Sequence, residues 1–98
     1  MNPQQPAPKI QLSSTADYRE SYANSVQVRL SLWDFFLTFG TIDQPAPDLV
    51  NIHNFQGIFL SPQQAKALAN VLNQNVQQYE SAFGEIKLAP TAAGAIIQ

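Results

Sequence analysis

The sequence predicts an α+β domain in which a three-stranded antiparallel sheet is followed by one long amphipathic helix, and it predicts that this domain is oligomeric. Apolar and polar residues alternate between positions 25 and 40, which is the period of half-buried strands. Between positions 62 and 83 apolar residues recur every three or four residues, which is the period of a helix face. A chain of 98 residues suffices for one small domain, whose limited core would be enlarged by an oligomer.

We divide the chain into a flexible Pro/Gln-rich tail (1–9), a single α+β domain (10–86) and an apolar C-terminal tail (87–98). Three prolines among the first eight residues favour extended, solvated backbone. The C-terminal tail is too short to span a bilayer. We expect it to dock on a partner subunit or a sheet edge, with a frayed end as the alternative.

The first two strands are predicted over residues 25–32 and 35–40. Val26, Val28 and Leu30 alternate with polar residues in the first run, and apolar residues resume the alternation in the second. Enrichment in aromatic and β-branched residues supports both strands. We therefore expect an antiparallel hairpin that turns at residues 32–34.

The next segment, residues 43–48, carries two prolines and two aspartates, which predicts an exposed loop. A third strand is predicted over residues 49–60, although its apolar residues fit no single alternation. We interpret Gly57 as a β-bulge that exchanges the two faces of this strand.

The helix is marked at both ends. Ser61 suits the N-cap, Pro62 the first helical position, and Gln64 completes a capping box. Gly84 is a natural stop after about 22 residues. One apolar stripe contains Ala65, Leu68, Ala69, Leu72, Val76, Tyr79 and Phe83. We expect Leu72 and Phe83 to pack against the sheet.

The composition disfavours several classes of function. Without cysteine the chain has no disulfide, thiolate metal site or cysteine nucleophile. A net charge of −2 with five scattered basic residues disfavours nucleic-acid binding. His53 is the single histidine, and we interpret it as a structural polar residue, although catalysis with Asp43 or Asp48 is an alternative. We expect no enzymatic activity, no catalytic or metal-binding residues and no cofactor.

The location of the protein is predicted from two further absences in the sequence. The N-terminal residues have neither the basic nor the apolar region of a signal peptide. No apolar run approaches the roughly 20 residues that span a bilayer. We therefore expect a cytoplasmic protein that does not enter a membrane.

Two kinds of surface are candidates for an interface. The first is the sheet face opposite to that of Phe35, Leu37 and Phe39, whose aromatic and apolar side chains would otherwise be exposed to water. The second is the polar side of the helix, whose neutral amides can enter an interface without the cost of desolvating an ion. The alternatives are core packing, a solvated helix face, and cover by residues 10–22 of the same chain. The candidate interface residues are Trp33, Phe36, Ile42, Asn73, Gln77, Ile96 and Ile97.

The run Leu60-Ser61-Pro62-Gln63-Gln64-Ala65-Lys66, followed by Leu72, Asn75, Tyr79-Glu80 and Phe83-Gly84-Glu85-Ile86, resembles a family of small bacterial and archaeal proteins of unknown function. Tyr22-Ala23-Asn24 and the run from Asp34 to Gly40 look like its upstream signature. This chain carries Gln and Asn where such proteins are often richer in Lys and Glu. The resemblance covers about residues 22–86, implies the strand-strand-strand-helix order and transfers no active site. The element order is also similar to half of the export chaperone SecB.

Three functional hypotheses follow. The first is a non-enzymatic, self-associating protein-interaction module, which also leaves room for another protein partner. The second is a SecB-like chaperone that holds unfolded polypeptide. The third is a weak nucleic-acid-binding protein that uses Arg29, Lys66 and aromatic stacking.

Overall fold

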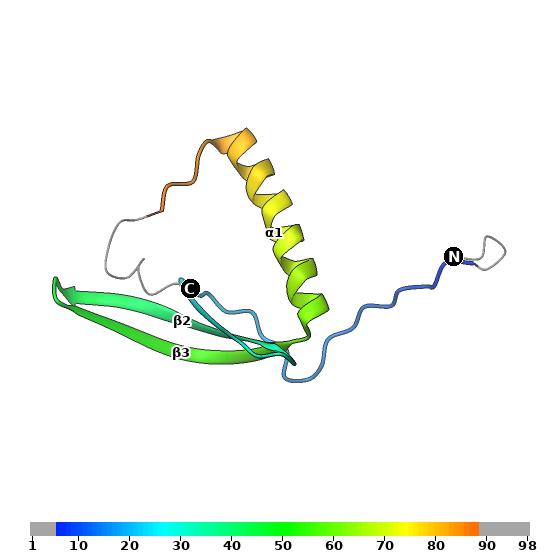
Figure 1. Cartoon of the computed structure of the whole chain (residues 1–98), viewed down its shortest axis with the longest axis horizontal. Coiled ribbons are helices and arrows are strands. Elements are labelled where there is room, and N and C mark those ends of the chain that lie inside the picture. Colours follow the sequence, from blue (N-terminus) through cyan, green and yellow to red (C-terminus); the bar gives the residue numbers. More distant parts are fainter. Residues whose placement is uncertain (1–5, 89–98) are drawn as a thin grey trace.

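The computed structural model describes residues 6–88, which form three strands and one helix (Figure 1). The elements are β1 (Ser25–Leu30), β2 (Phe35–Ala46), β3 (Leu49–Leu60) and α1 (Pro62–Phe83). The strands form one sheet in the order β1-β2-β3, with both neighbouring pairs antiparallel. The predicted α+β class and its order of elements are confirmed. The predictions for the tail beyond Leu88, including Ile96 and Ile97, lie outside the described residues.

The first hairpin turns where the sequence predicts, and a serine side chain holds it. The Ser31 backbone N–H donates to the Asp34 carbonyl over 2.9 Å. The Ser31 hydroxyl accepts from the backbone N–H groups of Trp33 (3.1 Å) and Asp34 (3.2 Å). Because Ser31 belongs to the turn, β1 ends at Leu30, two residues earlier than predicted.

The predicted loop over residues 43–48 is wrong, because β2 continues to Ala46 and only Pro47 and Asp48 form the turn. β1 begins at Ser25, opposite Gly40, so the part of β2 beyond Gly40 has a neighbour on one side only. Pro45 falls where the pairing with β3 slips between Asp43 and Ala46. A proline lacks the N–H of a regular ladder and is tolerated at such an irregular edge position.

A β-bulge is present in β3, but at Phe55 rather than at Gly57. Phe39 lies opposite Gln56, whereas the next residue, Gly40, lies opposite Asn54. The extra residue between them is therefore Phe55. The strands approach closely here, because a Cβ added to Gly40 would lie 2.6 Å from the carbonyl oxygen of His53.

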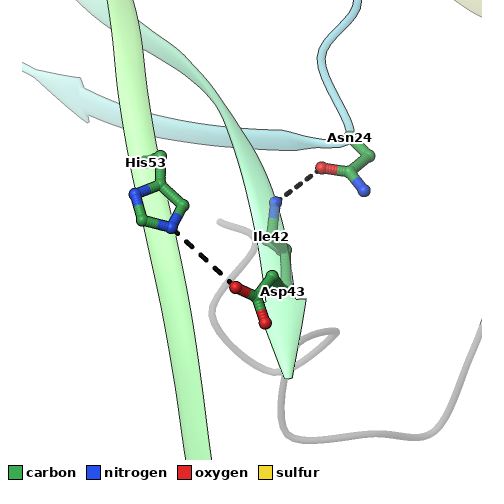
Figure 2. Close-up of polar contacts among 4 residues, drawn as sticks. All are labelled: Asn24, Ile42, Asp43 and His53. Atoms are coloured by element: carbon green, nitrogen blue, oxygen red, sulfur yellow. Dashed lines mark hydrogen bonds and ion pairs between the residues drawn. The ribbon is translucent and has the colours of Figure 1, made fainter. Parts of the chain in front are cut away.

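Asn24, the residue before β1, hydrogen-bonds to β2 through both its backbone and its side chain. The Asn24 backbone N–H donates to the Gly40 carbonyl over 3.1 Å. The Asn24 Oδ1 accepts from the backbone N–H of Ile42 over 2.7 Å, as Figure 2 shows. Beyond this point β2 pairs with β3 alone. The two strands extend from the three-stranded part of the sheet as a long ribbon (Figure 1).

The register divides the sheet into two different faces, because directly opposed residues of antiparallel strands share a face. We call one the groove face, which carries Val26, Val28, Leu30, Phe35, Leu37, Phe39, Ile58 and Leu60. We call the other the open face, which carries Gln27, Arg29, Phe36, Thr38, Gly57 and Phe59. The prediction that Phe36 lies on the opposite face of the sheet from Phe35 and Leu37 is therefore confirmed.

Both ends of α1 are where the capping signals predict. Ser61 has an extended backbone, and its side chain accepts from the Gln64 backbone N–H over 3.1 Å. Pro62 occupies the first turn, where its missing N–H leaves no helical bond unmade. At the other end Gly84 adopts a φ of 105°, and its N–H donates to the Glu80 carbonyl over 3.0 Å.

α1 does not lie flat on the sheet. It begins at the end of β3, separated only by Ser61, and rises away so that the gap to the sheet widens toward its C-terminal end (Figure 1). Leu72 is 54% exposed and Phe83 is 77% exposed, so the prediction that both pack against the sheet is wrong for the single chain. Among residues 6–88 no hydrophobic side chain is fully buried.

Candidate functional site

The space between the sheet and the first half of α1 is an apolar groove with a volume of about 460 Å³. Its walls come from the groove face of the sheet and from the first three turns of the helix. The lining residues are Val26, Val28, Phe35, Leu37, Leu60, Pro62, Ala65, Lys66, Leu68, Ala69 and Leu72. Lys66 is the one charged member of this list. Such a lining has almost nothing with which to bind a polar ligand, and it favours an apolar occupant.

Small and large helix residues line the groove together, with Leu68 and Leu72 as its large members. Pro62, Ala65 and Ala69 lie in the half of the apolar stripe that faces the sheet. Beyond the groove, in the second half of the helix, the stripe consists of Val76, Tyr79 and Phe83. Val76 is 41% exposed and Tyr79 is 50% exposed, and the Tyr79 and Phe83 rings pack on each other with centroids 5.0 Å apart.

Two charged side chains, Lys66 and Glu80, belong to the helix, one near each end. Lys66 lines the groove. The Oε2 atom of Glu80 accepts from the backbone N–H of Ile86 over 2.9 Å, which ties the chain after Gly84 back to the last helical turn. Around them the polar side of the helix is neutral, as the sequence indicates.

The open face carries an aromatic cluster at its centre. Phe36 and Phe59 lie directly opposite each other on β2 and β3, with ring centroids 4.4 Å apart. On the other side the Arg29 guanidinium lies 4.9 Å from the Phe36 centroid, within the range of a cation–π contact. Gly57 makes room for the ring, because a Cβ there would lie 2.7 Å from Phe36. Phe59 remains 66% exposed, so this cluster is accessible from solvent.

Residues 17–23 lie beside the groove face and not beside the open face. With Phe39, Thr41 and Ile58 they line a second hollow of about 790 Å³. The alternative in which residues 10–22 cover Phe36 and Ile42 within one chain is therefore not what the structure shows. Tyr22, which lines the hollow, is 78% exposed and leaves it open.

A small polar turn precedes this hollow. The Thr15 hydroxyl donates to Asp17 over 2.6 Å, and this hydrogen bond lowers the pKa of the Asp17 carboxyl. The Tyr18 hydroxyl donates to Glu20 over 2.8 Å, which favours the neutral phenol and raises the pKa of Tyr18. All four groups are exposed, and Asp17 also lines the hollow, so this turn orders the chain where the hollow begins.

His53 and Asp43 form the one ion pair recorded among residues 6–88, and the two residues lie on neighbouring positions of the β2–β3 ribbon (Figure 2). His53 Nε2 is 4.0 Å from Asp43 Oδ2, beyond hydrogen-bond distance. The side chains are 68% and 56% exposed, so the pair lies on the surface of the ribbon and not in an enclosed site. Asp48, the other predicted alternative, lies in the turn after Ala46.

The predicted interface residues are dispersed over the fold. Phe36 is half-buried on the open face, and Ile42 is half-buried on the ribbon, opposite Ile52. Trp33 lies in the first turn, 78% exposed, and so belongs to neither face. The helical amides Asn73 and Gln77 are exposed.

Sequence reasoning missed the role of two sets of residues. The pairing of Phe59 with Phe36 depends on the register between β2 and β3. Because the bulge was predicted at the wrong residue, this register could not be predicted. The groove depends on the departure angle of α1, for which the pattern carries no signal. The change from small to large residues along the stripe could have been noticed from the sequence.

Within residues 6–88 no group of three or more His, Asp or Glu side chains could hold a metal ion. In the same range no helix combines the length and the apolar character needed to cross a membrane.

The chain is thus a small α+β protein whose sheet and helix enclose an open apolar groove. A family model described as a protein of unknown function, DUF3467, matches residues 1–88. The chain belongs to this family, as the resemblance in its helical motif implies. No curated protein was found to match it. No solved structure was found to match it either.

Proposed function

We propose that the chain is a non-enzymatic, self-associating protein-interaction module of the cytoplasm, and that its working form is a homo-oligomer. One observation carries this proposal: residues 6–88 contain a regular sheet and a regular helix, yet no hydrophobic side chain among them is fully buried. A cysteine-free chain is compatible with the reducing cytoplasm.

The energetic reason is the cost of leaving this apolar surface in water. Fully burying a Val, Leu or Phe side chain contributes about 1.5–3 kcal/mol, and a chain of this length has little other stabilisation to draw on. Val76, Tyr79 and Phe83 lie beyond the groove and are 41%, 50% and 77% exposed. A second copy supplies an apolar surface of matching extent, and closed two-fold pairing is the commonest way for small proteins to use one.

Light scattering coupled to size exclusion, together with sedimentation equilibrium, tests the proposal on the full chain. We expect a mass of at least twice the 10.8 kDa chain mass at micromolar concentration. We also expect the melting temperature to rise with concentration, because association stabilises the folded state by mass action. A folded monomer that persists at high micromolar concentration would overturn the proposal.

A second candidate function, a chaperone-like holder of unfolded polypeptide, is favoured by the open face. Its exposed aromatic cluster, with Arg29 over Phe36 and Phe59 66% exposed, offers apolar and cationic contacts to an extended chain. We expect several unrelated unfolded proteins to bind at micromolar affinity and Phe59→Ala to weaken all of them. Single-stranded oligonucleotides are the competing probe: salt-sensitive binding in fluorescence anisotropy would favour the nucleic-acid hypothesis instead.

A further inference from the structure

We propose that the α1 helices of two copies pack antiparallel along their apolar stripes, with the two-fold axis passing between Leu72 and Asn73. The second half of each helix then enters the groove of the other copy. The inference rests on the proposed self-association and specifies its geometry. It follows from three properties of the helix: the sizes of the residues in its stripe, the positions of its charges, and the neutrality of its remaining surface.

The first property is the match between small and large residues. An axis between residues 72 and 73 places Ala69 level with Val76 of the other copy, and it places Ala65 within one residue of the level of Tyr79. It also places Pro62 opposite the position of Phe83. These three small residues line the groove together with Leu68 and Leu72, and the three large ones lie exposed beyond it. The small residues in the first half of one helix can therefore pack against the large residues in the second half of the other helix. In a two-fold symmetric pair this contact occurs twice.

The second property is charge. Lys66 and Glu80 are about two heptads apart and lie on the same edge of the stripe. In an antiparallel pair equal edges face each other, so the same axis brings Lys66 of each copy to Glu80 of the other. A parallel two-fold pair would instead place identical residues at the same height, lysine near lysine and glutamate near glutamate. One oxygen of Glu80 already accepts from the Ile86 N–H, and the carboxylate has a second oxygen for the ammonium group.

The third property is the low cost of burying the rest of the helix surface. Between Pro62 and Phe83 the helix carries no charged residue besides these two, and its flanking positions are amides. Burying an unpaired charge would oppose association, whereas an amide can exchange its hydrogen bonds with water for others at the rim. The groove itself supplies apolar walls from Val28, Leu37 and Leu60.

Charge reversal tests this geometry by sedimentation equilibrium of the full chain. Lys66→Glu alone and Glu80→Lys alone each convert two attractive contacts per dimer into two repulsive ones. Because ion pairs near the surface are weak, we expect the dimer dissociation constant to rise only about tenfold in each variant. The double variant restores both contacts and should return the constant to within about threefold of the original.

Matched controls separate pairing from mere changes of net charge. Lys87→Glu and Glu85→Lys make the same charge changes on exposed residues outside the helix and should leave the constant unchanged. Glu80→Gln removes the charge and keeps an acceptor for Ile86, so it should fall between the original chain and Glu80→Lys. Circular dichroism checks that each variant keeps its helix.

A cross-linking experiment locates the axis directly, because the chain has no cysteine of its own. Leu72→Cys places one thiol from each copy beside the axis and should form an interchain disulfide under mild oxidation. Gln74→Cys, on the opposite side of the helix, should not.

The outcomes distinguish the two proposals. A monomeric original chain would overturn self-association itself. A dimeric chain in which neither reversal weakens association, or in which the double variant fails to restore it, would overturn the antiparallel pairing and leave self-association standing. Cross-linking through Gln74→Cys in preference to Leu72→Cys would do the same.

Discussion

Leu72 and Val71 provide a matched pair for measuring how much the apolar stripe contributes to association. They are adjacent helical residues with nearly equal exposure in the single chain, 54% and 53%. Only Leu72 belongs to the stripe, because one residue along a helix is a rotation of about 100°. If the chain worked as a monomer, replacing either residue by alanine would have a similarly small effect.

In the self-associated form the exposed half of Leu72 becomes buried. Full burial of a leucine side chain contributes about 1.5–3 kcal/mol, so the exposed half contributes about 1 kcal/mol per chain and about 2 kcal/mol per dimer. Leu72→Ala should therefore raise the dimer dissociation constant about thirtyfold. Val71→Ala should change it by less than about threefold, because surface substitutions away from contacts cost little.

Sedimentation equilibrium over a dilution series of the full chain gives both constants, and circular dichroism verifies that each variant keeps its helix. Equal dissociation constants for the two variants would refute the reasoning that the stripe is the associating surface. A larger effect for Val71→Ala than for Leu72→Ala would move the interface to another face of the helix.

The remaining predictions concern local structure. Ser61→Ala removes the N-cap acceptor and should cost about 1 kcal/mol in urea unfolding. Gly40→Ala forces a Cβ against a backbone carbonyl 2.6 Å away and should cost about 1–3 kcal/mol, whereas Gly57→Ala meets a movable aromatic ring and should cost less. Glu20→Gln should lower the raised pKa of Tyr18 toward its ordinary value in an ultraviolet titration. Because the raised pKa favours the neutral phenol, the stabilising contribution is present below the ordinary pKa and is lost as the pH rises through the raised one.

Local signals in the sequence were enough to predict most of the fold. Ser61 and Gly84 delimit the helix because caps act through hydrogen bonds and backbone angles within a few residues. The alternation before the first turn likewise depends on neighbouring residues only. The predicted strand limits are wrong where tertiary pairing determines them. Pro45 is accommodated in β2 because β1 pairs only with the part of β2 up to Gly40. The bulge lies at Phe55 because the register between β2 and β3 changes there.

The candidate site was harder to predict for a different physical reason. An apolar stripe indicates that a helix packs against something, but it does not indicate whether the partner is its own sheet or another chain. Leu72 and Phe83 illustrate this, since both carry the signature of core residues and both are more than half exposed. The distinction depends on the direction in which the chain leaves Ser61, which no periodicity encodes.

The bond between the Asn24 side chain and the Ile42 N–H also acts as a lock on strand alignment. A slip of β1 by one residue would turn its valines to the wrong face, and a slip by two would keep the faces but break this bond. Ile42 lies just beyond the part of β2 that pairs with β1. Because its N–H already donates to Asn24, this N–H is not available to a strand of another molecule that would add to β2 at this point. A single asparagine side chain thus sets the alignment of β1 and blocks the corner of the sheet where β2 loses β1 as a neighbour.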